Sequence, residues 1–138
     1  MKAVSLLLIL FLTISCSSSE ETTTTNSGEL NGGWLPIRQE IGGQEVPITE
    51  FENQRIAIVD KTFLIIDEGA DQGSVIYKNG KMDIHVEVGG NAGRDFKAIY
   101  KFEDNILTIC YDLSGGTYPE SFETSNNPKL ILTVYRRE

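Results

Sequence analysis

The chain has 138 residues, of which 40% are hydrophobic and 23% are charged, and its 20 acidic and 12 basic residues give a net charge of −8. An acidic surface repels phosphate backbones, so the charge argues against a nucleic-acid partner. It suits solubility or a basic protein partner equally well. The length is enough for one domain with one hydrophobic core.

Residues 1–15 have the pattern of a secretory signal. Lys2 gives a basic start, residues 3–14 are almost wholly apolar, and Ser15 is a small residue at the expected cleavage position. The apolar core has about a dozen residues, which is too short to span a bilayer, since a spanning helix needs about 20.

A cysteine follows the apolar core directly. The run Leu12-Thr13-Ile14-Ser15-Cys16 is similar to the lipobox of bacterial lipoproteins, although Thr13 stands where many lipoboxes carry leucine. The resemblance implies that Cys16 becomes the lipidated first residue and anchors the protein to a membrane. An outer-membrane lipoprotein of the cell envelope is therefore expected. The alternative is an ordinary signal peptide with a cysteine nearby.

Residues 17–28 contain no apolar side chain. Nothing in them offsets the entropy cost of ordering, so residues 16–28 are predicted to form a lipidated flexible tether. Loss of residues 1–15 removes Lys2 and no acidic residue, so the net charge moves from −8 to −9. If Cys16 carries lipid, Cys110 has no disulfide partner, and its strand-like surroundings predict a buried thiol.

Residues 29–138 are predicted to form one all-β domain. Runs rich in Ile, Val and Phe between turn residues predict eight strands, at residues 34–41, 55–60, 62–67, 74–78, 81–88, 96–103, 106–112 and 129–136. Residues 46–54 are a candidate short helix with Thr49 as its cap, and residues 69–73 are expected to form a loop.

Several single residues predict the geometry of these strands. Pro36 suits an edge or a bulge because it has no N–H to donate. Asn79-Gly80 is a strong hairpin signal, since both residue types tolerate positive φ, and Asp104-Asn105 predicts another turn.

Hydrophobic side chains alternate with polar ones in two of the strands. In residues 82–88 the apolar Met82, Ile84, Val86 and Val88 alternate with Asp83, His85 and Glu87. In residues 96–102 the apolar Phe96, Ala98, Tyr100 and Phe102 alternate with residues that include Lys97 and Lys101. One dry face per strand predicts an antiparallel sheet around a single core. Eight strands can enclose that core as an antiparallel barrel, with a sandwich as the rival architecture.

Several motifs in order resemble known families. Gly32-Gly33-Trp34 contains the Gly-x-Trp that opens the first strand of lipocalins, and the chain ends in a leucine-alternating strand, Leu130 to Glu138. Together with Gly43-Gln44-Glu45-Val46-Pro47 and the run from Tyr100 to Cys110, these resemble a family of small lipocalin-like bacterial domains first noted in planctomycetes, whose function is uncharacterised.

The resemblance implies a lipocalin-like barrel with at most one short helix, and it brings no activity. It also implies a structural role for Gly32 and for Trp34, whose ring would be covered by Arg136 or Arg137 from the last strand. Such a cation–π contact is worth on the order of 1–2 kcal/mol when partly desolvated.

Aromatic residues predict where a ligand would bind. Tyr100, Phe102 and Tyr111 belong to strands, and the loop 114–128 carries Tyr118 and Phe122, which would form a lid or contact surface at the barrel rim. The alternative is that the loop aromatics pack onto the barrel. This pattern predicts a monomeric, non-catalytic protein that binds a small apolar ligand or a peptide in its mouth.

The sequence offers little for catalysis. The single histidine, His85, shares a strand face with Asp83 and Glu87, which favours a solvated face over a metal site. We therefore predict no catalytic residue, metal or cofactor. The alternative function is an inhibitor or immunity-type module that uses its acidic surface against a basic envelope protein.

Overall fold

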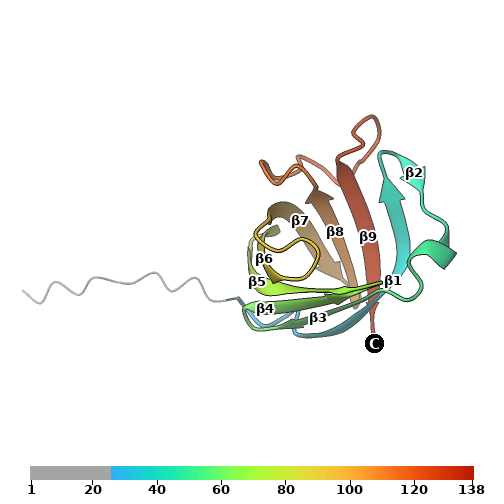
Figure 1. Cartoon of the computed structure of the whole chain (residues 1–138). Helices are drawn as coiled ribbons and strands as arrows, with labels where there is room; N and C mark the ends of the chain where they lie inside the picture. Colours follow the sequence, from blue (N-terminus) through green and yellow to red (C-terminus); the bar gives the residue numbers. More distant parts are fainter. Residues whose placement is uncertain (1–25) are drawn as a thin grey trace, which may run out of the picture.

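The computed structural model describes residues 26–138, and the described part of the chain is all-β apart from one 3₁₀ turn (Figure 1). Its elements in chain order are β1 (Gly32–Ile41), β2 (Gln44–Glu45), the 3₁₀ turn η1 (Ile48–Glu50), β3 (Arg55–Val59), β4 (Thr62–Ile66), β5 (Ala70–Lys78), β6 (Lys81–Val88), β7 (Asp95–Glu103), β8 (Ile106–Asp112) and β9 (Leu130–Arg137). The predicted fold class is confirmed.

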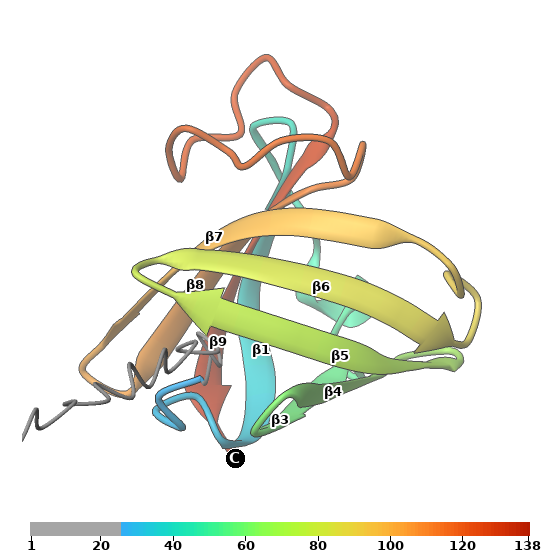
Figure 2. The ribbon, with the colours of Figure 1, turned by 90° about the vertical axis from the view of Figure 1, so that its left-hand side faces the viewer.

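Eight of the strands close into an antiparallel barrel. From β3 to β9 each strand pairs with the next, and β1 pairs with both β3 and β9 (Figures 1 and 2). The contact with β3 uses residues 32–34 of β1, and the contact with β9 uses residues 34–41. Closure leaves the eight strands without an open sheet edge. The barrel, rather than the rival sandwich, is therefore the architecture.

Tight turns set the register of the hairpins. Asn79 and Gly80 have φ of +51° and +75°, and Asp104 and Asn105 have φ of +52° and +62°. Two successive residues with positive φ are typical of the type I′ turn, whose twist matches the flanking strands. Both predicted turns are confirmed. The predicted irregularity at Pro36 is present as a register shift between Pro36 and Arg38.

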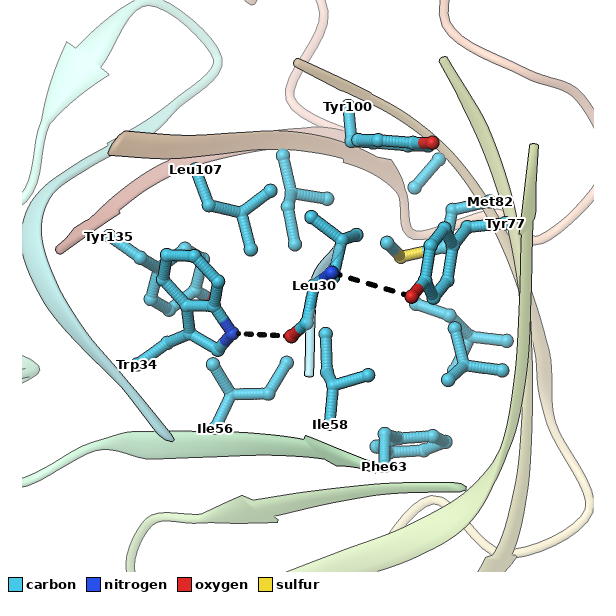
Figure 3. Close-up of a cluster of buried hydrophobic side chains, with 14 of the residues drawn as sticks. Leu30, Trp34, Ile56, Ile58, Phe63, Tyr77, Met82, Tyr100, Leu107 and Tyr135 are labelled. Carbon is cyan, nitrogen blue, oxygen red and sulfur yellow. Dashed lines mark hydrogen bonds between the residues drawn. The ribbon is translucent and has the colours of Figure 1, made fainter. Parts of the chain in front are cut away.

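The end of the barrel next to these turns, called here the closed end, is filled by side chains. The largest fully buried ones include Leu30, Trp34, Ile58, Phe63, Tyr77, Met82, Leu107 and Ile109. Figure 3 shows Leu30 in the middle of this cluster. Its carbonyl accepts a hydrogen bond from Trp34 Nε1 at 2.9 Å, and its N–H donates to the Tyr77 hydroxyl at 3.4 Å. The segment before β1 thus plugs this end without leaving its polar groups unpaired.

Arg137 completes the closed end. Its guanidinium lies over the Trp34 ring, with Cζ 4.4 Å from the ring centroid, and donates to the carbonyls of Asn31 and Glu29, each at 2.8 Å. Gly32 makes room for it, because a Cβ there would lie 2.9 Å from Arg137 Nη1 and φ is +136°. Of the two arginines considered from sequence, Arg137 covers the tryptophan, whereas Arg136 is exposed.

Two local predictions are wrong. Residues 46–54 do not form a capped helix: the helical part is only η1, its N-cap is Pro47 and no side chain caps it. Residues 69–73 are not a loop throughout, because β5 begins at Ala70 and pairs with both β4 and β6. Gly73 sits at the β5–β6 bulge, where a Cβ would lie 1.9 Å from the carbonyl oxygen of His85. Gly73 therefore allows close strand approach, whereas Gly69 lies in the bend between β4 and β5.

The predicted flexible tether, residues 16–28, extends too far along the chain. Asn26 is buried, its side-chain amide donates to the carbonyls of Asp60 and Val75, and its Oδ1 accepts from the N–H of Tyr77 at 2.8 Å. The Asn26 side chain thus makes hydrogen bonds to backbone groups of the barrel, and composition alone does not reveal this role. Residues 26–28 therefore belong to the barrel. Cys16 and the rest of the predicted signal and tether, up to residue 25, lie outside the described residues.

Candidate ligand-binding cavity

The other end of the barrel, called here the mouth, contains a cavity of about 250 Å³. It is lined mostly by inward-facing residues of the strands and by residues just beyond the strand ends. These are Gln39, Gln54, Phe63, Ile65, Asp67, Asp71, Ile84, Val86, Asn91, Phe96, Tyr111, Leu113, Ile131, Thr133 and Tyr135. The barrel is thus filled at one end and hollow at the other.

The cavity floor is the upper surface of the packed core. Phe63, Ile84, Val86 and Tyr135 line the cavity and also belong to the buried core cluster, with exposed fractions between 2% and 7%. Close packing beneath them gives a rigid, apolar floor. A dry cavity of roughly 150 Å³ is enough to hold a benzene ring, whereas drug-sized ligands need roughly 300–1,000 Å³. The space therefore suits one small molecule.

Neutral polar groups stand in one wall of the cavity. The hydroxyls of Tyr111 and Tyr135 are 3.4 Å apart, and Gln39 Nε2 donates to Thr133 Oγ1 at 3.1 Å. Burial raises the pKa of Tyr111 well above its ordinary value, and the neighbouring Tyr135 raises it further. Burial also raises the pKa of Tyr135. Both hydroxyls therefore stay protonated and can orient a polar group of a ligand.

Among residues 26–138, two carboxylates are the only charged side chains that line the cavity. Asp67 accepts hydrogen bonds from Gln54 Nε2 at 2.9 Å and from the N–H of Glu68 at 2.7 Å. Asp71 accepts from Nδ2 and the N–H of Asn91, at 2.6 and 3.1 Å. The loop that carries Asn91 can approach because Gly89 has φ of +116°, and a Cβ there would lie 2.1 Å from Asp71 Oδ1.

Of the five residues predicted to bind a ligand, only Tyr111 lines this cavity. Tyr100 lies at the closed end, edge-on to Tyr77, and its hydroxyl donates to Glu29 at 3.2 Å. Phe102 packs edge-on against Trp34, with ring centroids 5.6 Å apart. Both face inward as predicted. Their strand β7 runs from the mouth to the closed end, however, so they belong to the filled half.

Tyr118 and Phe122 lie on the outer wall of the barrel, in the segment 113–129 between β8 and β9, called here the strap. The Tyr118 hydroxyl donates to Asp83 Oδ1 on the outward face of β6 at 2.6 Å. Phe122 packs beside Cys110, Leu130 and Leu132, which form a second buried cluster. The expectation of a lid at the rim is wrong, and the alternative, that the aromatics pack onto the barrel, is the observed arrangement.

Two carboxylates hold the strap in place, the half-exposed Asp83 and the buried Asp112. Burial opposes ionisation of Asp83, but hydrogen bonds from Lys97 and Tyr118 outweigh it, so its pKa is lowered. Burial likewise opposes ionisation of Asp112, but hydrogen bonds from Ser114 and Thr117 outweigh it and lower its pKa. The ammonium groups of Lys81 and Lys97 lie 4.9 and 5.0 Å from the Tyr118 ring centroid. The first half of the strap is therefore held to the barrel at two places, through Asp112 and through Asp83.

Polar side chains on the outward face of β6 pair with side chains of β7. His85 Nδ1 is 2.7 Å from Asp95 Oδ1 on β7, and Asp83 is bonded to Lys97, all on the outer wall. Within residues 26–138 no three His, Cys, Asp or Glu side chains are grouped so that they could hold one metal ion.

Cys110 is buried, and burial raises its pKa to about 11, an effect that Glu40 and Asp112 reinforce.

Sequence reasoning missed most of the cavity. Alternation does indicate that Ile84, Val86 and Phe96 face inward, but it does not reveal which end of a strand is hollow. The position of the strap did leave a signal. Residues 106–110 and 130–134 are apolar or threonine at nearly every position, which is typical of strands buried on both faces. Such strands require a cover on the outer wall.

No protein-family model matches the chain, and no curated protein or solved structure is significantly similar to it. The resemblance to small lipocalin-like bacterial domains therefore stays a prediction. In the part of the chain that the structure describes, no helix is long and apolar enough to cross a membrane. The class that the fold defines is a closed antiparallel barrel with one filled and one hollow end.

Proposed function

We propose that this protein is a lipid-anchored, non-catalytic binding protein of the bacterial cell envelope that takes one small, mainly apolar molecule into the mouth of its barrel. The observation that carries the proposal is the cavity of about 250 Å³ above a packed floor. Apolar walls with a few convergent polar groups are typical of small-molecule sites. The only histidine lies on the outer wall with Asp95, away from this space.

The placement of the amino-terminal segment supports the same arrangement. Asn26 is bonded to Asp60 in the turn between β3 and β4, and Leu30 plugs the closed end. Asn26, the first residue that the structure describes, therefore lies at the closed end, opposite the mouth. A protein anchored through Cys16 would keep its mouth free for a ligand from the aqueous side.

The proposal predicts that filling the cavity abolishes binding. Ile131 lines the cavity, so Ile131→Trp should place an indole ring in the space that a ligand needs. With 2-phenylethanol as the probe, we expect calorimetric titration to show affinity at least tenfold weaker for this variant than for the unmodified chain. The matched control is Ile76→Trp, which adds the same ring to the exposed outer face of β5.

The control variant should bind the probe as the unmodified chain does, and far-UV circular dichroism should show the same barrel in all three proteins. Equal binding by both tryptophan variants would place the probe outside the cavity. Absence of binding by the unmodified chain at millimolar probe would remove the basis for a small apolar ligand.

A further inference from the structure

Beside the cavity lies a second hollow of about 340 Å³, called here the acidic recess. Ile65, Asp67 and Asp71 line both spaces, so the two hollows adjoin each other at these residues. The other residues of the recess are Glu50, Glu68, Gly69, Ala70 and Gly90. In the described part of the chain, its lining therefore contains four carboxylates and no lysine, arginine or histidine.

The negative charge of the recess is not neutralised within the described residues. Asp67 and Asp71 receive hydrogen bonds only from neutral donors, namely Gln54, Asn91 and backbone N–H groups. None of the five ion pairs among residues 26–138 involves Glu50, Asp67, Glu68 or Asp71. A carboxylate has about four acceptor positions, so both aspartates retain capacity for a further donor.

Arg94, in the loop that also carries Asn91, is engaged outside both hollows. The guanidinium of Arg94 stacks on Phe96, with Cζ 4.7 Å from the ring centroid, and donates to the carbonyl of Leu113 and to Asn91 Oδ1. It lines neither hollow. An anionic ligand such as a fatty acid would meet repulsion at the recess and no positive charge in the cavity, whereas a cation would meet attraction.

We infer that the ligand is a cationic amphiphile: a small apolar or aromatic body in the cavity, with an ammonium or guanidinium group in the acidic recess facing Asp67 and Asp71. This inference rests on the proposed function and adds the charge of the ligand to it. The apolar body gains from burial against Phe63, Ile65 and Phe96, and the head group gains from charge-assisted hydrogen bonds to the two aspartates.

Three probes of nearly equal shape test the inferred charge of the ligand. Calorimetric titrations would compare 2-phenylethylammonium, 2-phenylethanol and phenylacetate at pH 7 and low ionic strength. We expect the ammonium to bind about tenfold more tightly than the alcohol, and the carboxylate to bind most weakly. In the double variant Asp67→Asn/Asp71→Asn the preference for the ammonium over the alcohol should fall to about twofold or less.

Glu87→Gln is the matched control, because it removes one negative charge from an exposed position that lines neither hollow. It should keep the full preference for the ammonium. Equal affinity for all three probes, or a preference that survives in the double variant, would overturn the cationic assignment and leave the proposed apolar site standing. Binding of none of the three would overturn both.

Discussion

Replacing Trp34 by alanine should lower the free energy of unfolding by about 3–5 kcal/mol, which is the range for truncating a large aromatic side chain in a core. Trp34 is fully buried, packs against Phe102, lies under Arg137 and donates to the carbonyl of Leu30. The variant loses all three contacts at once and leaves a void at the closed end. Urea unfolding followed by far-UV circular dichroism measures the change.

Two comparisons sharpen this prediction. Tyr118→Ala removes a half-buried ring from the outer wall and should cost much less, since the strap is held by fewer contacts than the core. Trp34 is the only tryptophan of the chain, so its fluorescence reports on this site alone and should be blue-shifted in the folded protein. A loss of less than 1 kcal/mol in Trp34→Ala would mean that the closed end is not packed as described.

Replacing Cys16 by alanine should release the protein from membranes or leave it uncleaved. The prediction follows from the similarity of residues 12–16 to a lipobox, since a lipidated amino terminus partitions into the bilayer and an unmodified one does not. Cell fractionation followed by immunoblotting measures the distribution. Cys110→Ala is the matched control, because that thiol is buried in the barrel, and the variant should stay with the membranes.

A soluble, unmodified form of the natural chain would contradict lipidation. So would equal behaviour of the two cysteine variants, because only one of these cysteines lies where a lipobox requires it. Mass spectrometry of the amino-terminal peptide separates an uncleaved chain from a cleaved and lipidated one.

The barrel could be predicted from sequence because two independent signals agree. Period-two alternation in residues 82–88 and 96–102 predicts one buried face per strand, and the turn residues at 79–80 and 104–105 predict where the chain reverses. Both depend on local physics, so they are readable without knowing the partners of each strand. The predicted short helix, in contrast, is reduced to the single 3₁₀ turn Ile48–Glu50, which has no side-chain cap.

The cavity could be predicted only in part, because it depends on which end of the barrel each residue occupies. Tyr100, Phe102 and Tyr111 all face inward, yet only Tyr111 reaches the hollow half. The plug formed by Leu30 fills the other half, and a leucine before the first strand gives no sign of that role. In the sequence, Asp67 and Asp71 have the pattern of ordinary turn residues. Their position at the rim of the mouth follows only from the pairing of β4 with β5.

The strap shows a further limit of sequence reasoning. Tyr118 and Phe122 in a long loop resemble exposed contact residues. The outward faces of β7, β8 and β9, however, carry an apolar patch that needs covering, formed by Ile99, Cys110, Leu130, Leu132 and Val134. Burying those side chains under the strap stabilises the barrel, so the loop packs sideways rather than over the mouth. The interaction pairs residues far apart on different strands, which alternation within one strand does not reveal.

The central claim is that the mouth of the barrel is a hollow site and the closed end is filled. Nuclear magnetic resonance titration of the labelled protein with 2-phenylethanol tests it most directly, because the probe is neutral and small. We predict saturable shift changes at Ile65, Phe96, Tyr111 and Ile131, with none at Trp34, Phe102 or Tyr118. Shift changes centred on the strap or the closed end, or none at millimolar probe, would contradict the claim.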